Sequence, residues 1–345
     1  MPHRPIIALT AGDCTGIGPE LVATIVAERR VAEDARLLLI GDARVFEEGQ
    51  RRAGKPFRMQ PCLHPAQADW SGEAIPTIDL ANTDPSHFPV GVADANSGKA
   101  TGDTLKAAID LAIAGSVDAV SFAPLNKRAL YDGGWRFPDE HRMFAHLLGH
   151  RGHFSEMNVL GPWWMSRVTS HVSLRQALDQ IDATSIRNAI RLAVDTMRRA
   201  GIEQPRLAVA ALNPHAGENG LFGSEEIDTI APAVAAMAAE GYACEGPFPA
   251  DTVYLKAFGG VYDGVLAMYH DQGQIAMKLI GFDRGVTFLA GFPFPICTPA
   301  HGSAYDIAGQ GIADVGASRA AVLLAARMAR TGRDQMPGAM SPMGA

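Results

Sequence analysis

Three histidines stand where apolar runs give way to loops: His171, His215 and His270. Each follows a run typical of a buried strand, and the carboxyl ends of parallel strands lie side by side at one edge of a sheet. Neutral imidazoles are good ligands for zinc and other first-row divalent ions, and three protein ligands with one open position describe a catalytic metal site. One such histidine alone would more often be structural. The three together favour a metal site.

Charged side chains near these histidines offer further chemistry. Asp271 directly follows His270, and a carboxylate in that place can orient the imidazole or hold a substrate hydroxyl. Asp251 offers a second carboxylate, and Lys278, about two helical turns after His270, can neutralise a substrate anion. An open metal beside an anion site suits hydride transfer from an alcohol to a nicotinamide, but the residues alone do not favour this over metal-assisted hydrolysis.

A glycine-rich loop begins at Asn213 and leads into an amphipathic run. Gly217, Gly220 and Gly223 can expose backbone N–H groups to an anion ahead of a helix, where the helix dipole is positive. Asn213 and these glycines are therefore the candidate cofactor-binding residues. The alternative is an ordinary glycine-rich turn with Ser224 as the helix cap.

The elements that must position these residues alternate between strand and helix, which predicts a doubly wound α/β architecture. A chain of 345 residues is long enough for two domains. The expected strands include 6–10, 36–41, 117–123, 164–169, 206–212 and 262–268, and the expected helices include 21–30, 104–114, 186–200, 225–239 and 318–330.

Composition excludes several classes of function. A hydrophobic content of 47% with 19% charged residues is globular, and a net charge of -7 argues against a nucleic-acid partner. No apolar run approaches the length of a membrane span. The four cysteines are far apart without a CxxC pair, so a reducing cytoplasm is the expected location.

Three further segments are weak signals when taken alone. Gly12–Glu20 is a tight turn between a strand and a helix, but it does not complete the GxGxxG fingerprint of dinucleotide sites. Lys99 opens a helix, but Ala100 stands where a P-loop needs Ser or Thr. The charged start of a helix at Glu140–Arg142 is more often solvated capping than a site.

Taken together, these motifs resemble the 4-hydroxythreonine-4-phosphate dehydrogenase (PdxA) family over nearly the whole chain. The matching segments are Gly12–Glu20, Pro124–Lys127, Ser170–Arg175, Leu212–Glu226, Gly246–Thr252, Tyr269–Gly273 with Lys278, and His301–Gly311. The resemblance implies an isocitrate/isopropylmalate-dehydrogenase-like fold of two α/β/α domains with an interdomain cleft. The first domain would comprise residues 1–125 and 290–345, and the second, residues 126–289, would carry the metal ligands and the dimer interface.

The resemblance also implies a chemistry and a set of residues. It implies NAD or NADP as oxidant and a divalent metal, zinc, magnesium or cobalt, on His171, His215 and His270. Asp251, Asp271 and Lys278 would be catalytic residues near the substrate. The active site would be shared between the subunits of a homodimer. A hydroxy acid, 4-phosphooxy-L-threonine in the family, would be oxidised to a β-keto acid that then loses carbon dioxide.

The sequence departs from the family at substrate-binding positions. Glu140, His141 and Arg142 stand where the family has a Gly-His-Thr-Glu segment, and His141 matches only if the register slips by one. The family's Asn and Arg beyond the lysine fall on Thr287 and Ile296, so a bidentate anion clamp is missing there. Arg142 is a candidate replacement. These departures favour a changed substrate over drift at tolerant positions.

Three functions therefore remain open. The first is a dehydrogenase of a hydroxy acid, including a threonate or erythronate phosphate. The second is a dehydrogenase of a cyclic dihydrodiol carboxylate, whose apolar pocket would use Trp163 and Trp164, or Phe288 and Phe292. The third is a sensor that binds metal and nucleotide without turnover.

Overall fold

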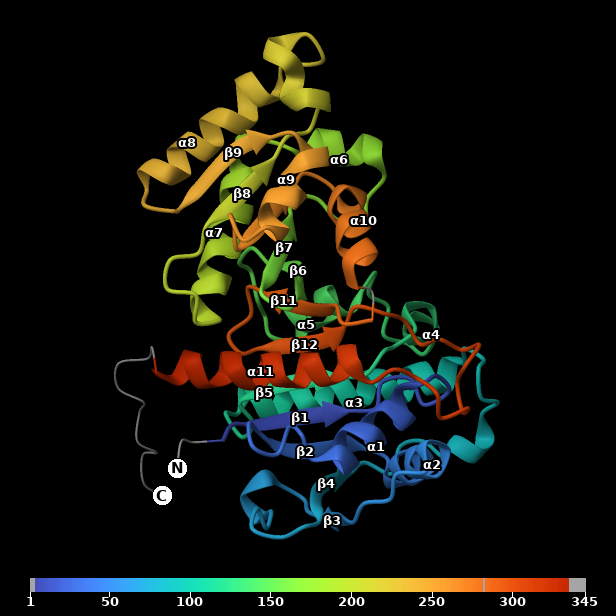
Figure 1. Cartoon of the computed structure of the whole chain (residues 1–345). Coiled ribbons are helices and arrows are strands. Elements are labelled where there is room, and N and C mark those ends of the chain that lie inside the picture. Colours follow the sequence, from blue (N-terminus) through green and yellow to red (C-terminus); the bar gives the residue numbers. More distant parts are fainter. Residues whose placement is uncertain (1–3, 282, 335–345) are drawn as a thin grey trace. The chain divides into compact units, whose positions relative to one another are not determined.

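The computed structural model describes residues 4–281 and 283–334 (Figure 1). The chain divides into two compact units, Met1–Arg151 with Phe292–Ala345 and Gly152–Gly291. Both units are built from strands and helices, which confirms the expected α/β class.

The segment 126–151 belongs to the first unit, whereas the sequence analysis assigned it to the second domain. The physical reason is local packing, because helix α4 (Lys127–Asp132) lies against helix α3 (Ala95–Ile113).

The first unit has a parallel sheet in the order β3-β4-β2-β1-β5-β12. Its strands are β1 (Ile6–Thr10), β2 (Arg36–Gly41), β3 (Met59–Pro61), β4 (Ile75–Asp79), β5 (Ala119–Phe122) and β12 (Ile296–Pro299). Its remaining helices are α1 (Gly18–Glu28), α2 (Ala43–Ala53), α5 (Glu140–Leu147) and α11 (Gly316–Asp334), with short 3₁₀ turns η1 (Pro65–Gln67) and η2 (Pro85–His87). A proline stands in the first turn of α1, where its missing N–H has no cost.

The second unit has a mixed sheet in the order β11-β6-β7-β10-β8-β9. Its strands are β6 (Ser155–Leu160), β7 (Trp163–Arg167), β8 (Leu207–Ala210), β9 (Cys244–Phe248), β10 (Gly264–Ala267) and β11 (Val286–Ala290). Its helices are α6 (Leu174–Gln180), α7 (Ala183–Arg199), α8 (Ala231–Ala239), α9 (Ala250–Phe258) and α10 (His270–Gly281), with η3 (Pro214–Gly220) and a π-helical turn η4 (Glu226–Ile230). Strand β6 is antiparallel to both β7 and β11, and the strands from β7 to β9 are parallel.

Strand β10 lies between β7 and β8, and the three strands run in the same direction. Their carboxyl ends therefore share one edge of the sheet, and each leads into a candidate metal ligand. His171 follows β7, His215 follows β8 and His270 begins the helix after β10. The expected placement of the three histidines at neighbouring strand ends is thus present in the fold.

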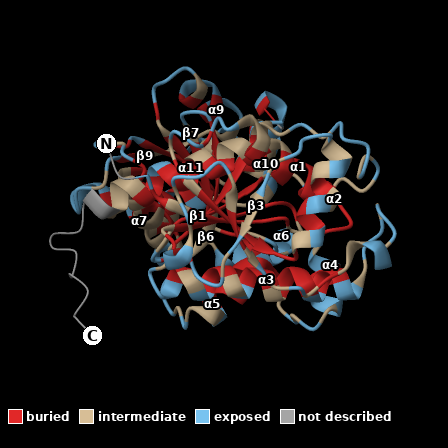
Figure 2. Ribbon diagram, turned by 90° about the horizontal axis from the view of Figure 1, so that it is seen from below, coloured by how far each residue is buried: buried red, intermediate tan, exposed pale blue. Residues whose placement is uncertain are grey.

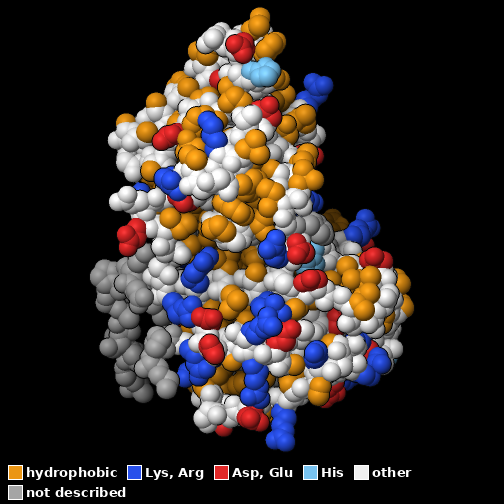
Figure 3. All heavy atoms as spheres, viewed as in Figure 1, with side chains coloured by type: hydrophobic (Ala, Val, Ile, Leu, Met, Phe, Trp, Pro, Cys, Tyr) orange, Lys and Arg blue, Asp and Glu red, His pale blue; other side chains and the backbone are white. Residues whose placement is uncertain are grey.

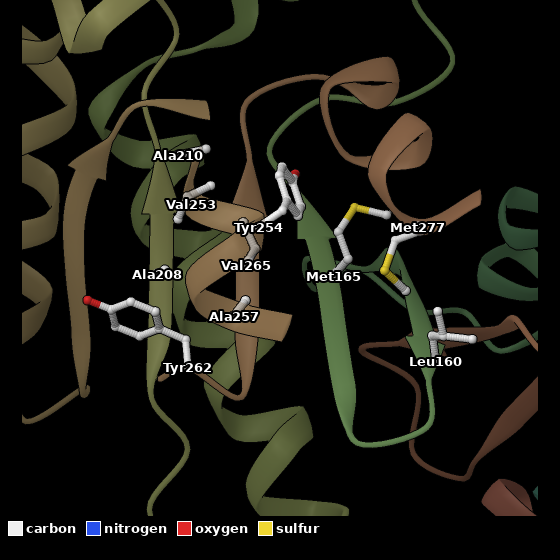
Figure 4. Close-up of a cluster of buried hydrophobic side chains, with 10 residues drawn as sticks. All are labelled: Leu160, Met165, Ala208, Ala210, Val253, Tyr254, Ala257, Tyr262, Val265 and Met277. Carbon is white, nitrogen blue, oxygen red and sulfur yellow. The ribbon is translucent and has the colours of Figure 1, made fainter. Parts of the chain in front are cut away.

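An apolar cluster fixes α9 and α10 on this sheet. Figure 4 shows Met165 of β7 and Met277 of α10 side by side, with Tyr254 of α9 over the same sheet face. Gly273 brings α10 close to β7, because an added Cβ would lie 2.1 Å from the Met165 sulfur. Buried residues concentrate in the strands and on the inner faces of the helices (Figure 2). The helix that begins with His270 is therefore held by packing along its length.

Candidate active site

A cavity of about 220 Å³ opens at the carboxyl edge of the second unit's sheet. Its lining comes from the segment after β7, which includes His171, and from the residues after β10, which include His270. The two imidazole rings lie with their centroids 5.7 Å apart. Both side chains are a little over one-third exposed, at 39% and 37%, so a solute can reach them.

The carboxylate of Asp271 orients the His270 ring of this pair. Its Oδ1 lies 2.7 Å from Nδ1 of His270, which leaves Nε2 of that ring for another partner. A carboxylate on the second nitrogen is the usual way in which proteins orient a metal-ligating histidine. On the other ring, Nε2 of His171 lies 4.0 Å from a carboxylate oxygen of Glu156. The pair therefore combines two imidazoles with two carboxylates.

Hydrogen bonds from two side chains connect the carboxyl ends of β7, β10 and β8. The Thr169 hydroxyl donates to the Met268 carbonyl over 3.0 Å and so joins the ends of β7 and β10. The Gln272 amide accepts from the Met268 N–H over 2.7 Å and donates to the Ala211 carbonyl over 2.7 Å. Gln272 thus connects the start of α10 to the end of β8, just before the His215 loop. Neither residue stood out in the sequence, since each acts through a partner distant in the chain.

His215 lies in η3, in a stretch of unusual backbone. Residues 215–219 all have positive φ, between 43° and 79°, which makes one left-handed turn. Left-handed backbone costs roughly 1–2 kcal/mol for each residue with a Cβ, and such outliers persist mainly at functional sites. His171 also has a positive φ, of 54°. The His215 ring contacts Phe222, with 6.2 Å between ring centroids. The structure therefore brings His171 and His270 together and leaves His215 in the neighbouring loop.

The glycine-rich loop is built around a carboxylate of the protein itself. Buried Glu226 accepts hydrogen bonds from the N–H groups of Leu212 and Asn213 over 2.8 and 2.7 Å, and from the Asn213 side chain over 2.9 Å. Burial alone would raise the pKa of Glu226, but these hydrogen bonds outweigh it and hold the pKa below its usual value. Glu226 therefore engages Asn213, one of the candidate cofactor residues, through both its N–H and its side chain.

The candidate cofactor residues around that carboxylate differ in what they face. A Cβ on Gly217 would lie 2.7 Å from Glu226, and one on Gly223 would lie 2.6 Å from the Asn213 amide, so these two glycines pack against protein atoms. At Gly220 the nearest atom is a side-chain carbon of Ile227 at 3.6 Å. Gly220 alone among the three leaves room for another molecule. Ser224 donates to Asp228 and is not a side-chain cap of the following helix.

The three candidate catalytic residues are all exposed. Asp271 lines the cavity. Asp251 lies in the first turn of α9 and Lys278 in the last turn of α10, and neither belongs to the lining of this cavity among the described residues. A role for Asp251 or Lys278 therefore needs a substrate that extends beyond the histidine pair.

The candidate substrate residue Thr287 belongs to a buried polar network. Its hydroxyl accepts from the Asn158 amide over 3.2 Å, because the two residues are direct partners in the β6–β11 pairing. The Asn158 oxygen accepts from fully buried Arg167 over 2.9 Å and from Gln274 over 2.7 Å. Arg167 also donates to Glu156, the carboxylate near His171. This network reaches the candidate site through Glu156, and no short sequence motif indicates it.

The other candidate substrate residues lie in the first unit. Glu140 and His141 are buried at the start of α5, and Lys127 lies 3.6 Å from the Glu140 carboxylate. Arg142 is exposed, so its guanidinium is accessible to an anion. Ile296, at the position of the family's arginine, is fully buried in β12 and cannot contact a ligand.

The aromatic residues considered for a dihydrodiol pocket are mostly core residues. Trp164 and Phe288 are each 2% exposed and pack edge to face, with 6.1 Å between ring centroids. Phe292 is also 2% exposed, and Trp163 packs on Phe258 at 5.1 Å. These rings therefore stabilise the fold and are not arranged to line an apolar substrate pocket.

In the first unit, Asp13 organises the glycine turn that follows β1. Its buried carboxylate accepts from the Thr15 hydroxyl over 2.8 Å, from Ser97 over 3.1 Å and from the Tyr305 hydroxyl over 2.5 Å. Burial, more than the bond to Asp13, raises the pKa of Tyr305 well above its usual value. Lys99 pairs with Asp103 on the surface, as expected for a solvated lysine.

Comparisons with known proteins agree with this architecture. A family model described as "Pyridoxal phosphate biosynthetic protein PdxA" matches residues 33–325. A provisionally named 4-hydroxythreonine-4-phosphate dehydrogenase 2 of Rhizobium meliloti is 46% identical over 331 residues, which cover 96% of this chain and 95% of that protein. A D-threonate 4-phosphate dehydrogenase of Cupriavidus necator is 41% identical over 313 residues, covering 90% and 93% of the two chains. The crystal structure of a 4-hydroxythreonine-4-phosphate dehydrogenase from Klebsiella pneumoniae superposes with a TM-score of 0.84 at 39% identity, covering 95% and 99%.

Proposed function

The chain belongs to the pyridoxal phosphate biosynthetic protein PdxA family, and from this premise we propose that it oxidises the alcohol of a phosphorylated hydroxy acid with a nicotinamide cofactor. Its class is that of an oxidoreductase acting on CH–OH, because its relatives are dehydrogenases named for phosphorylated hydroxy acids. The observation that carries the proposal is the pair His171 and His270 in one cavity at the carboxyl edge of the sheet.

The donor set of this cavity fits a divalent cation. Two imidazoles share the cavity, and Asp271 holds the Nδ1 side of His270 so that Nε2 is directed to another partner. His215 in the neighbouring loop is the proposed third ligand. A cation bound here, zinc, magnesium or cobalt, would act as a Lewis acid toward the substrate alcohol and carbonyl.

The protein's own side chains have three proposed roles. Asp271 orients His270 through its hydrogen bond. Lys278 and Asp251, both exposed beyond the cavity, would hold the charged and hydroxyl groups of the substrate, Lys278 by neutralising an anion. Among the three loop glycines, we propose that the backbone around Gly220 contacts the cofactor. Gly217 packs against Glu226 and Gly223 against Asn213, so these two have no room for it.

The proposed substrate follows from the side chains that are accessible to its anionic group. Thr287 is engaged by Asn158 and Ile296 is buried, so the family's clamp is absent in this chain. Arg142 is exposed and is the proposed replacement. Since the candidate aromatic residues are packed in the core, we favour a phosphorylated acid, 4-phosphooxy-L-threonine or a threonate or erythronate phosphate, over a dihydrodiol. Oxidation next to the carbon that bears the carboxylate gives a β-keto acid, so loss of carbon dioxide completes the proposed reaction.

A homodimer is part of the same proposal. Three large apolar side chains on α9 and α10 face solvent in the single chain: Leu255, Ile275 and Leu279 are 72%, 61% and 82% exposed. Figure 3 shows apolar side chains gathered on the face of the second unit that carries these helices. Exposed apolar patches of this kind are typical of protein interfaces.

The four unpaired cysteines agree with a reducing cytoplasm.

A substrate panel with purified protein tests the proposal. We expect chelator-sensitive reduction of NAD or NADP with 4-phosphooxy-L-threonine or D-threonate 4-phosphate, accompanied by release of carbon dioxide. Turnover of a dihydrodiol without turnover of any phosphorylated acid would overturn the substrate class. Binding of metal and nucleotide without turnover of any substrate would indicate the sensor instead.

Among the helices that the structure describes, none has the length and apolar character of a membrane span.

A further inference from the structure

A second cavity, of about 130 Å³, lies in the first unit at the opposite edge of its sheet from the Asp13 turn. It is formed where β2 and β4 begin, next to the end of α1 (Figure 1). Its apolar wall comes from Val26, Val31 and Leu37, which are all buried. Trp70 closes another side. This pocket is independent of the proposed dehydrogenase site.

Arg36, the first residue of β2, provides the polar group of the pocket. Its guanidinium carbon lies 5.5 Å from the centroid of the Trp70 ring, a cation–π contact. Its Nε is buried and has no hydrogen-bond partner among the described residues. Because Nε is buried, a molecule in the pocket would meet the charge of Arg36 through the rest of its guanidinium.

The charges around the pocket favour an anion. Three arginines and two carboxylates line it. Both carboxylates have partners: Asp69 accepts from Ser71, and Glu73 lies 3.8 Å from Arg29. The third arginine, Arg4, donates to a backbone carbonyl and keeps its charge. An anionic ligand at Arg36 would therefore meet an excess of positive charge.

We propose that this pocket binds a small aromatic carboxylate. The volume is close to that of an engineered cavity of about 150 Å³ that holds benzene, so one six-membered ring fits. The ring would contact Trp70 and the apolar wall, and the carboxylate would pair with the guanidinium of Arg36. A neutral ring would leave the charge of the guanidinium without a counter-ion, and a bare oxyanion would leave the apolar wall unused.

The test is calorimetric titration of the full-length protein with benzoate. We expect saturable binding in the millimolar range, which is the strength that one ring and one charge-assisted bond provide. Benzyl alcohol and inorganic phosphate should each bind at least about tenfold more weakly. Benzyl alcohol keeps the ring but lacks the negative charge, and inorganic phosphate keeps the charge but lacks the ring. Absence of saturable benzoate binding, or equal binding of inorganic phosphate, would overturn the proposal.

Variants locate the site. Arg36→Gln should weaken benzoate binding by roughly tenfold or more, whereas Arg30→Gln should not change it, since Arg30 lies in the segment between α1 and β2 but outside the pocket. If Arg36→Gln does not fold, Ala74→Phe places a large side chain in the pocket from a half-buried lining position and should abolish binding without unfolding the protein. Benzoate binding that survives in a folded pocket variant would contradict the assignment.

Discussion

The Gln272 side chain donates to the Ala211 carbonyl over 2.7 Å, and this bond joins the helix that begins with His270 to the strand that precedes His215. The same amide accepts from the Met268 N–H, so both of its ends are engaged. Gln272 therefore sets the spacing between two of the three proposed metal ligands.

Replacing Gln272 with Glu should loosen the His215 loop. The variant keeps the acceptor for Met268 but loses the N–H that reaches Ala211, and a buried carbonyl left without its donor costs about 1–3 kcal/mol. Amides of residues 212–220 should exchange with deuterium faster in Gln272→Glu. Gln180→Glu, an exposed change on α6, is the control. Equal exchange in the two variants would show that the bond does not hold the loop.

Replacing Asp271 with Asn should weaken metal binding. The carboxylate at 2.7 Å from Nδ1 fixes the His270 ring, and loss of such a partner typically reduces metal affinity by about 10- to 100-fold. Calorimetry with zinc on chelator-treated protein measures the change. Asp179→Asn, an exposed carboxylate on α6, should leave zinc affinity unchanged. If both variants bind zinc equally well, Asp271 does not support the ligand.

Glu226 makes the stability of the glycine loop dependent on pH. Its pKa in the folded protein is below the unfolded value of 4.5, so its contribution is present at neutral pH and is lost as pH falls through the folded pKa. At pH 7, Glu226→Gln should lower the free energy of unfolding by about 1.5–3 kcal/mol, the value of hydrogen bonds to a charged group. Urea unfolding should show this difference shrinking below about pH 4. A difference that is constant across this range would exclude the charge as its cause.

Arg142 should bind the anionic end of the substrate if it replaces the missing clamp. Arg142→Gln should then raise KM for the phosphorylated acid by roughly tenfold with little change in kcat, because the lost contact is uniform for substrate and transition state. Arg136→Gln, another exposed arginine of the first unit, is the matched control. An unchanged KM in the Arg142 variant would show that another residue, such as Lys127, binds the anionic end of the substrate.

The sequence predicted those parts of the molecule that local patterns determine. Apolar runs located the strands, and the shared carboxyl edge followed from their parallel order, which is why the rings of His171 and His270 lie near each other. The role of Glu226 was missed because its partners, Leu212 and Asn213, lie on the other side of the loop. Only the folded loop shows that Glu226 accepts hydrogen bonds from these two N–H groups.

Long-range register accounts for contacts that no short motif contains. Thr287 is a candidate substrate residue, and the antiparallel pairing of β11 with β6 places it directly opposite Asn158. The register of an antiparallel pair is set by the whole sheet, so no short motif contains it. Trp164 and Phe288 were candidates for a pocket, but β7 and β11 both pair with β6, and the two rings pack against each other in the core.

The most direct test of the account is the amount of divalent metal that each chain retains. After equilibrium dialysis against zinc, the unchanged protein should hold one tightly bound ion per chain. His171→Ala and His270→Ala should each lose that ion together with dehydrogenase activity, while His64→Ala, an exposed histidine of the first unit, should keep both. If the His171 and His270 variants retain the ion and the activity, the paired imidazoles are not the metal site.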